Sequence, residues 1–148
     1  MKICHVCKAA RWRQTKIISH VIDATANGAI ELWFHSPDTN VFILSVRGYL
    51  SLHKNRLFVK GTGQNHCKIK LQPIFHALGP AKAAALPAFH PLSGTNKTGC
   101  FSGKGKASCW KAFMKPEEEV IRGLSDLGMS ETPSAETMTL IEKFESQL

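Results

Sequence analysis

The chain has 148 residues, of which 43% are hydrophobic and 20% are charged, and its formal net charge is +8. That length and composition suit a globular protein with one hydrophobic core and exclude a disordered chain. No apolar run is long enough to cross a bilayer, and the N-terminal stretch MKICHVCKAARWRQ lacks the apolar centre of a signal peptide. Five cysteines without the spacing of a disulfide framework indicate a reducing compartment. We therefore expect an intracellular protein, nuclear or cytoplasmic, with no membrane partner.

Charge is divided unevenly along the chain. Residues 1–116 hold seventeen Lys and Arg against three acids, a formal charge of +14, whereas residues 117–148 hold eight acids against two basic residues, a formal charge of −6. A body this basic favours polyanions, since their phosphates attract Lys and Arg. We expect a strongly basic domain over 1–116 and an acidic helical extension over 117–148. The extension either shields the basic face or is a solvated appendage.

The chain begins with a Cys-x-x-Cys pair formed by Cys4 and Cys7. A structural zinc site needs four ligands, and no second pair of cysteines or histidines follows at a suitable spacing. Spacing alone therefore gives little support to a zinc site.

Hydrophobic periodicity and the positions of Gly and Pro predict an α/β fold. The predicted elements before residue 91 are a helix over 14–27, a strand over 30–34, a short helix over 41–50, strands over 57–60 and 68–71, and helices over 73–78 and 81–90. The two later strands flank a glycine-rich loop, which favours a β-hairpin. The last two helices are separated by Gly79 and Pro80. The prediction is a small, mostly parallel sheet with flanking helices.

One acidic residue follows the predicted strand 30–34. Asp38 lies in the segment His35-Ser36-Pro37-Asp38-Thr39-Asn40. Open α/β sheets bind ligands outside the carboxyl ends of their strands. Asp38 is therefore a candidate site residue.

The stretch from Pro87 to Phe113 is the most informative part of the chain. It predicts the end of an apolar helix, a turn rich in Gly, Ser and Lys, and the start of a second helix, so that the segment is a helix–turn–helix. Gly103, Lys104, Gly105 and Lys106 stand at the start of the second helix, where backbone N–H groups and lysine charge favour phosphate. The alternative is a surface loop that lysine keeps soluble.

The rest of the chain predicts further helices. Pro116, followed by three glutamates, favours a new helix, because acids stabilise a first turn. Ser134 resembles the N-cap of a last amphipathic helix. The aromatic residues Trp33, Phe101 and Trp110 are able to stack on bases, although a place in the core is the more ordinary role for each.

The segment Pro87–Phe113 resembles the helix–turn–helix core of PIN-like and flap-endonuclease-like nucleases. It is most similar to a transposon-related animal branch that has the pattern ALPAFHALSGCDNTGSFSGKGKxxxWKAF. Residues 86–90, 101–106 and 110–113 match that pattern almost letter for letter. The resemblance extends over roughly a hundred residues, far more than a short motif. It implies a partial PIN-like domain with phosphate-binding residues Lys97, Gly103, Lys104, Gly105 and Lys106.

Active members of this superfamily cut phosphodiesters with Mg²⁺ or Mn²⁺ held by carboxylates. The resemblance places a first acid in an upstream segment that this chain is expected to lack, and five more within its length. A Glu-x-Asp pair aligns with Trp12 and Gln14, an Asp-Thr-Asp triplet with Asp38, Thr39 and Asn40, and a single Asp with Asn96. Asp38 is the only acid retained, and Gln14, Asn40 and Asn96 are degenerate positions.

The loss of four carboxylates bears directly on catalysis. Each one, at about 4 Å and an effective dielectric constant near 20, removes roughly 4 kcal/mol of attraction for a unit charge. Asparagine offers a carbonyl oxygen but cannot neutralise a cation. We therefore expect no resident cofactor and no nuclease catalysis, unless a partner chain supplies acids.

Four hypotheses follow from the sequence. The first is a catalytically impaired PIN-like domain that binds the backbone of DNA or RNA without sequence preference. The second is a weak metal-dependent nuclease that acts through Asp38 and one ion. The third is a protein-interaction module that uses its acidic C-terminal helices, with partners that the sequence does not identify. The fourth is a truncated, decaying copy of a mobile-element gene without a selected function.

Overall fold

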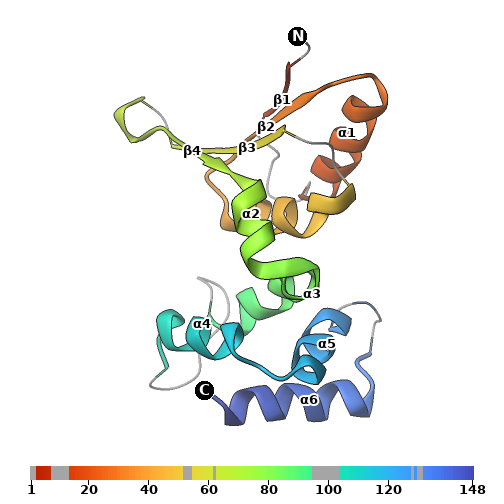
Figure 1. Cartoon of the computed structure of the whole chain (residues 1–148), viewed down its shortest axis with the longest axis vertical. Helices are drawn as coiled ribbons and strands as arrows, with labels where there is room; N and C mark the ends of the chain where they lie inside the picture. The colour runs from red at the N-terminus through yellow and green to blue at the C-terminus, as the bar shows by residue number, and fades with distance from the viewer. Residues whose placement is uncertain are drawn as a thin grey trace. The chain divides into compact units, whose positions relative to one another are not determined.

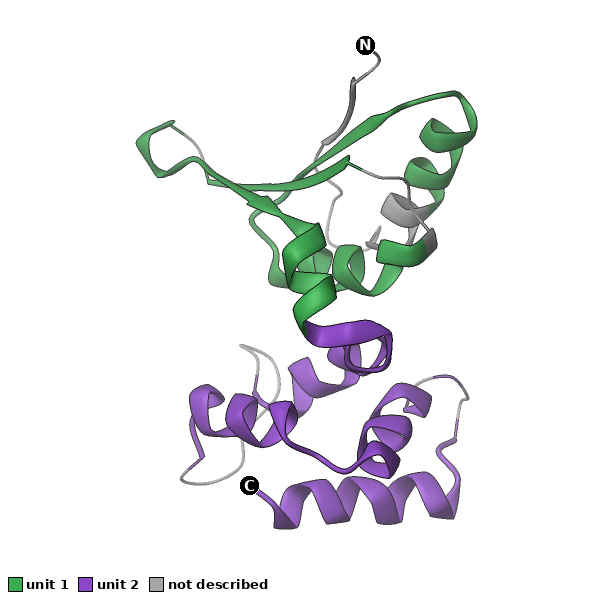
Figure 2. Ribbon diagram, in the orientation of Figure 1, with its two compact units in different colours: residues 1–77 green, residues 78–148 purple. Residues whose placement is uncertain are grey.

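The computed structural model describes residues 3–7, 14–51, 55–61, 63–94, 104–127, 129 and 132–148, and for residues 3–7, 14–18 and 51 it describes the backbone alone. The chain forms two compact units, residues 1–77 and residues 78–148 (Figure 2). Each unit has a distinct architecture, since the described strands all belong to the first unit and the second is helical.

The first unit is built on a mixed sheet with the strand order β1-β2-β3-β4 (Figure 1). Its elements in chain order are β1 (Ile3–Cys7), α1 (Gln14–Ala26), β2 (Glu31–His35), α2 (Thr39–Arg47), the 3-10 helix η1 (Gly48–Ser51), β3 (Asn55–Lys60), the 3-10 helix η2 (Gly63–Asn65) and β4 (Cys67–Lys70). The first three strands are parallel, and β4 pairs with β3 in the antiparallel sense. This confirms the predicted α/β class and the predicted hairpin.

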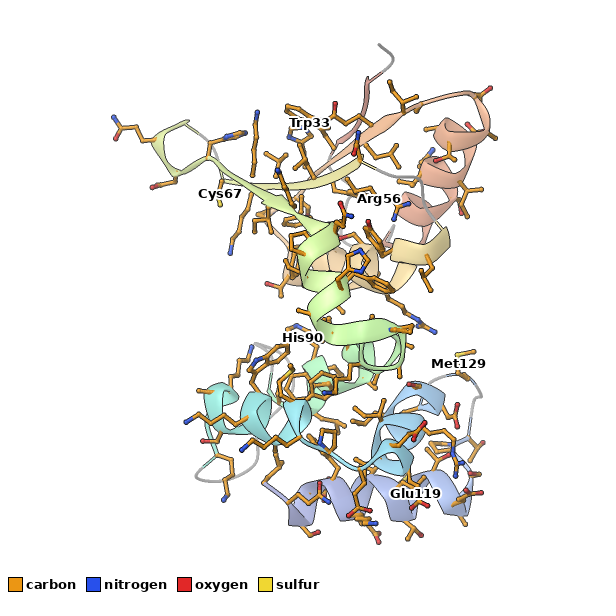
Figure 3. All side chains as sticks on the ribbon, viewed as in Figure 1. Trp33, Arg56, Cys67, His90, Glu119 and Met129 are labelled. Atoms are coloured by element: carbon orange, nitrogen blue, oxygen red, sulfur yellow. The ribbon has the colours of Figure 1, made fainter. Side chains whose placement is uncertain are left out.

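The strand order determines where the helices lie. Both connections between parallel strands advance in the same direction across the sheet, so right-handed crossovers place α1 and α2 on one face. Figure 1 shows both helices on that side. The core lies beneath them, where Leu32, Phe34 and Phe58 are buried. Trp33 points to the opposite face, on which Lys68 lies over its ring with Nζ 4.3 Å from the ring centroid (Figure 3).

Arg56 is an unexpected member of the buried face, because a basic residue in a short strand is ordinarily exposed. It is 5% exposed, its guanidinium donates to the carbonyl of Tyr49, and it lies 4.4 Å from the centroid of the Tyr49 ring. Burial lowers the pKa of Arg56 to about 10, against a smaller opposing influence of Tyr49. The side chain is therefore held by a backbone carbonyl and an aromatic ring.

The second unit consists of helices packed around an aromatic core. It takes in the C-terminal part of α3 (Leu71–Leu92), together with α4 (Lys106–Met114), α5 (Glu118–Asp126) and α6 (Ala135–Ser146). Gly79, with φ of 75° and ψ of 166°, breaks α3 at the predicted point before Pro80. Phe89 stacks on Phe113, with their ring centroids 4.3 Å apart. Phe144 from α6 completes this cluster, 6.3 Å from Phe89.

One boundary and one strand were not expected from the sequence. The change of charge at residue 116 falls inside the second unit, between α4 and α5. The strand β1, which contains the Cys-x-x-Cys pair, was not predicted. Among the described helices, none is both long enough and apolar enough to cross a membrane.

Candidate nucleic-acid interface

The start of α4 gathers three of the predicted phosphate-binding residues. Gly105 is the N-cap, with extended backbone at φ −76° and ψ 159°, and Lys106 is the first helical residue. Lys104, Gly105 and Lys106 are all exposed. Gly105 has no side chain with which to cap the helix, and the first turn of α4 holds no acid. The positive end of the helix dipole is therefore left without an anionic partner on its own helix.

Contacts with α3 hold α4 in place within the second unit. Lys82 donates from Nζ to the carbonyl oxygen of Met114 over 2.7 Å, which satisfies one carbonyl at the C-terminal end of α4. Phe113 is fully buried against Phe89. Both contacts involve the last turn of α4, so they hold the C-terminal end of this helix against α3.

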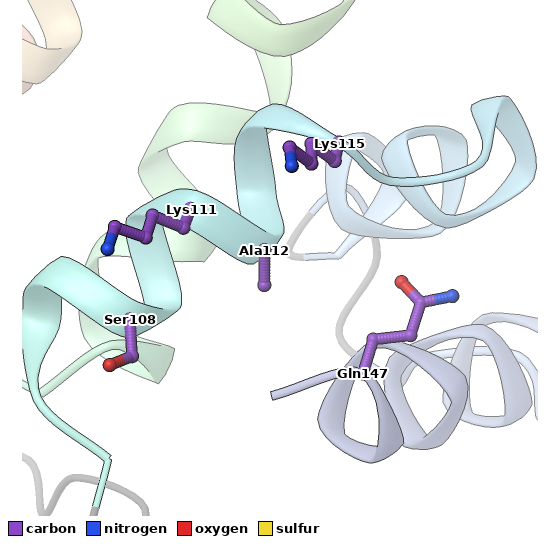
Figure 4. A pocket seen from close by; sticks show the side chains of 5 residues that line it. All are labelled: Ser108, Lys111, Ala112, Lys115 and Gln147. Carbon is purple, nitrogen blue, oxygen red and sulfur yellow. The ribbon is translucent and has the colours of Figure 1, made fainter.

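A second cationic surface lies along α4. Ser108, Lys111, Ala112 and Lys115 line a pocket of about 420 Å³ together with Gln147 at the end of α6 (Figure 4). These four α4 residues share one helix face through their spacing of three and four residues. The two lysines were not among the predicted site residues, although their spacing of four residues can be read from the sequence. Both also stand near the C-terminal end of α4, where cations stabilise the helix dipole.

Asp38 occupies the predicted place after β2, but its local role is structural. It is the N-cap of α2, and its Oδ1 accepts a hydrogen bond from the backbone N–H of Asn40 over 2.9 Å. The N–H of Asp38 in turn donates to Oγ of Ser36. Both bonds belong to an ordinary helix start. The order β1-β2-β3 does not reverse, so these described strands offer no topological switch point beside Asp38.

The surroundings of Asp38 do not fit the divalent metal that the family resemblance implies. Asp38 and Lys60 line the same pocket of about 190 Å³, with Phe42, Phe58 and Ile69 among its other walls. A lysine ammonium beside a single carboxylate opposes a second cation there. Within the described part of the chain, no group of three or more His, Cys, Asp or Glu side chains is arranged to hold a metal.

Several predicted site residues are only partly described. Asn40 is exposed in the first turn of α2, and Gln14 is the first residue of α1, with a side chain outside the description. Asn96, Lys97 and Gly103 lie outside the described residues, as do the side chains of Cys4 and Cys7. The described site residues therefore fall into two groups. Asp38 and Asn40 lie at the start of α2, and Lys104, Gly105 and Lys106 lie at the start of α4. The other predicted groupings stay predictions.

Comparisons with models of protein families, with curated proteins and with solved structures found no match for this chain.

Proposed function

We propose that this protein is a catalytically impaired PIN-like domain that binds the phosphate backbone of nucleic acids without cleaving it. The observation that carries the proposal is the start of α4, where two exposed lysines flank Gly105, an N-cap residue that provides no side-chain cap. Backbone N–H groups at a helix N-terminus and the ammonium groups of adjacent lysines both suit phosphate oxygens. The formal charge of +14 over residues 1–116 supports a polyanionic ligand.

The environment of Asp38 supports the non-catalytic part of the proposal. The carboxylate is engaged in capping α2, and Lys60 supplies positive charge to the same pocket. Cleavage by the mechanism of the resembled nucleases needs several carboxylates around the ions, because each ion carries two positive charges. Asp38 alone does not meet that need, so nucleic acid is a ligand of this chain rather than a substrate.

The proposal is tested by reversing charge at the start of α4. Lys104→Glu combined with Lys106→Glu is expected to weaken binding to labelled DNA at least tenfold. The slope of log K against log salt concentration should also fall by about two, since two phosphate contacts are lost. Fluorescence anisotropy at several salt concentrations measures both quantities.

A matched control makes the same charge change in the first unit. Lys60→Glu combined with Lys70→Glu alters two exposed lysines of β3 and β4 and should reduce affinity much less. An equal loss of affinity in the two double variants would mean that the protein attracts DNA only through its overall charge. That result would overturn a site at the start of α4.

A further inference from the structure

Trp110 is the exception among the large apolar residues of α4. Its neighbours Cys109 and Phe113 are 1% and 0% exposed, whereas Trp110 is 41% exposed. The sequence favoured a core position for this tryptophan, and the structure places a large part of its ring at the surface. An exposed indole lacks the favourable free energy that burial of its apolar surface would contribute to folding, so its exposure is not explained by stability.

The buried side of the Trp110 ring packs against two other aromatic rings. Its centroid lies 5.8 Å from that of Phe89, in an edge-to-face arrangement at 60°, and 5.6 Å from that of Phe113, with the planes at 37°. Phe89 and Phe113 are themselves buried and stacked. Trp110 therefore rests on a rigid aromatic cluster and presents a preorganised surface to solvent.

The helical segment that carries Trp110 is basic. The segment 104–115 holds four lysines and no acid. Lys106 precedes Trp110 by four residues, so the two side chains are neighbours on one side of α4. One turn of helix advances about 5.4 Å, which is comparable to the distance between a phosphate and the base of its own nucleotide. A cation and an aromatic ring at this spacing suit the two halves of one nucleotide.

We propose that Trp110 stacks on an unpaired base of a nucleic acid whose backbone is held by Lys104 and Lys106, so that the protein prefers single-stranded segments to duplex. This inference rests on the proposed function and specifies its ligand. A paired base inside a duplex does not offer its face to a side chain, whereas an unpaired base does. The positive charge of 104–115 favours a polyanion over a protein partner as the occupant of this surface.

The test compares two variants of the full chain, Trp110→Phe and Trp110→Leu. Both keep an apolar side chain on the Phe89 and Phe113 cluster, but only phenylalanine keeps an aromatic face. Affinities for a labelled oligo(dT) strand and for a blunt-ended, fully paired duplex are measured by anisotropy at one salt concentration. W110L should bind oligo(dT) about tenfold more weakly than wild type, with duplex affinity changed less than about twofold. W110F should retain most of the preference for the single strand.

A second readout follows the indole itself. In a chain carrying Trp12→Phe and Trp33→Phe, Trp110 is the remaining tryptophan, and oligo(dT) should quench its fluorescence if a base stacks on it. Absence of quenching, or unchanged binding of oligo(dT) by W110L, would overturn the inference and leave the ring as a surface for protein contacts. The two proposals can fail separately. If K104E/K106E weakens the binding of both ligands and W110L changes the binding of neither, only the stacking is refuted. A chain that binds neither ligand refutes both.

Discussion

The carboxylate of Asp38 accepts a hydrogen bond from the N–H of Asn40 at the start of α2. Asparagine caps helices about as well as aspartate, whereas alanine at an N-cap costs about 1 kcal/mol. We expect Asp38→Asn to leave the free energy of unfolding nearly unchanged and Asp38→Ala to lower it by about 1 kcal/mol. Urea denaturation followed by circular dichroism measures the difference.

The same pair of variants also addresses catalysis. If Asp38 were a metal ligand in a working nuclease, D38N and D38A would both abolish manganese-dependent cleavage. We expect no cleavage in the wild-type chain, and therefore no difference among the three proteins. Cleavage that both variants remove would support the second hypothesis and contradict the capping interpretation as a full account of Asp38.

For single residues, the sequence predicted correctly those properties that depend on neighbouring positions in the chain. Asp38 could be placed after a strand because strand and turn patterns are local. The burial of Arg56 and the exposure of Trp110 were not predictable, since both depend on which faces of distant elements meet. Composition assigns arginine to the surface and tryptophan to the core, and tertiary packing reverses both assignments here.

At the scale of elements, α4 starts at Gly105, which provides no side-chain cap, and two lysines flank that residue; each feature costs helix stability. Ala107 is the exposed second residue of the helix, where an acid would interact well with the helix dipole. We expect Ala107→Glu to raise stability by about 0.3–1 kcal/mol and, at the same time, to weaken nucleic-acid binding severalfold. Thermal unfolding and anisotropy on the same preparation measure the two effects.

The control for this prediction is Ala107→Gln, which has a similar shape but no charge. It should change stability and binding little. A loss of both stability and binding in A107E would mean that the substitution only damages the helix. An unchanged affinity would mean that phosphate does not approach the start of α4.

Most helices and strands were predictable because their signals are local. The helix α1, the break at Gly79 and the Ser134 cap, which accepts from the N–H of Thr137, all appear where the sequence indicated. The strand β1 was missed because five residues with two cysteines carry little periodic signal. The pairing of β1 with β2 depends on contacts between residues about 28 positions apart, which local patterns do not encode.

At the scale of the whole molecule, charge and architecture follow different divisions. The first compact unit ends at residue 77 of the chain, whereas the basic part of the sequence ends at residue 116. The second unit therefore holds both the lysines of α4 and the acids of α5 and α6. Lys143 of α6 pairs with Glu117 over 2.5 Å, and this hydrogen bond raises the pKa of Lys143. Within this unit, acidic side chains thus already engage one lysine of α6.

The most direct test of the account is an anisotropy titration of the full chain against labelled single-stranded, duplex and flapped DNA at low and moderate salt. The same samples are incubated with manganese and analysed for cleavage. We predict binding with a steep salt dependence, because phosphate contacts displace counterions, and we predict that the DNA stays intact throughout. Manganese-dependent cleavage of the DNA, or no binding even at low salt, would contradict it.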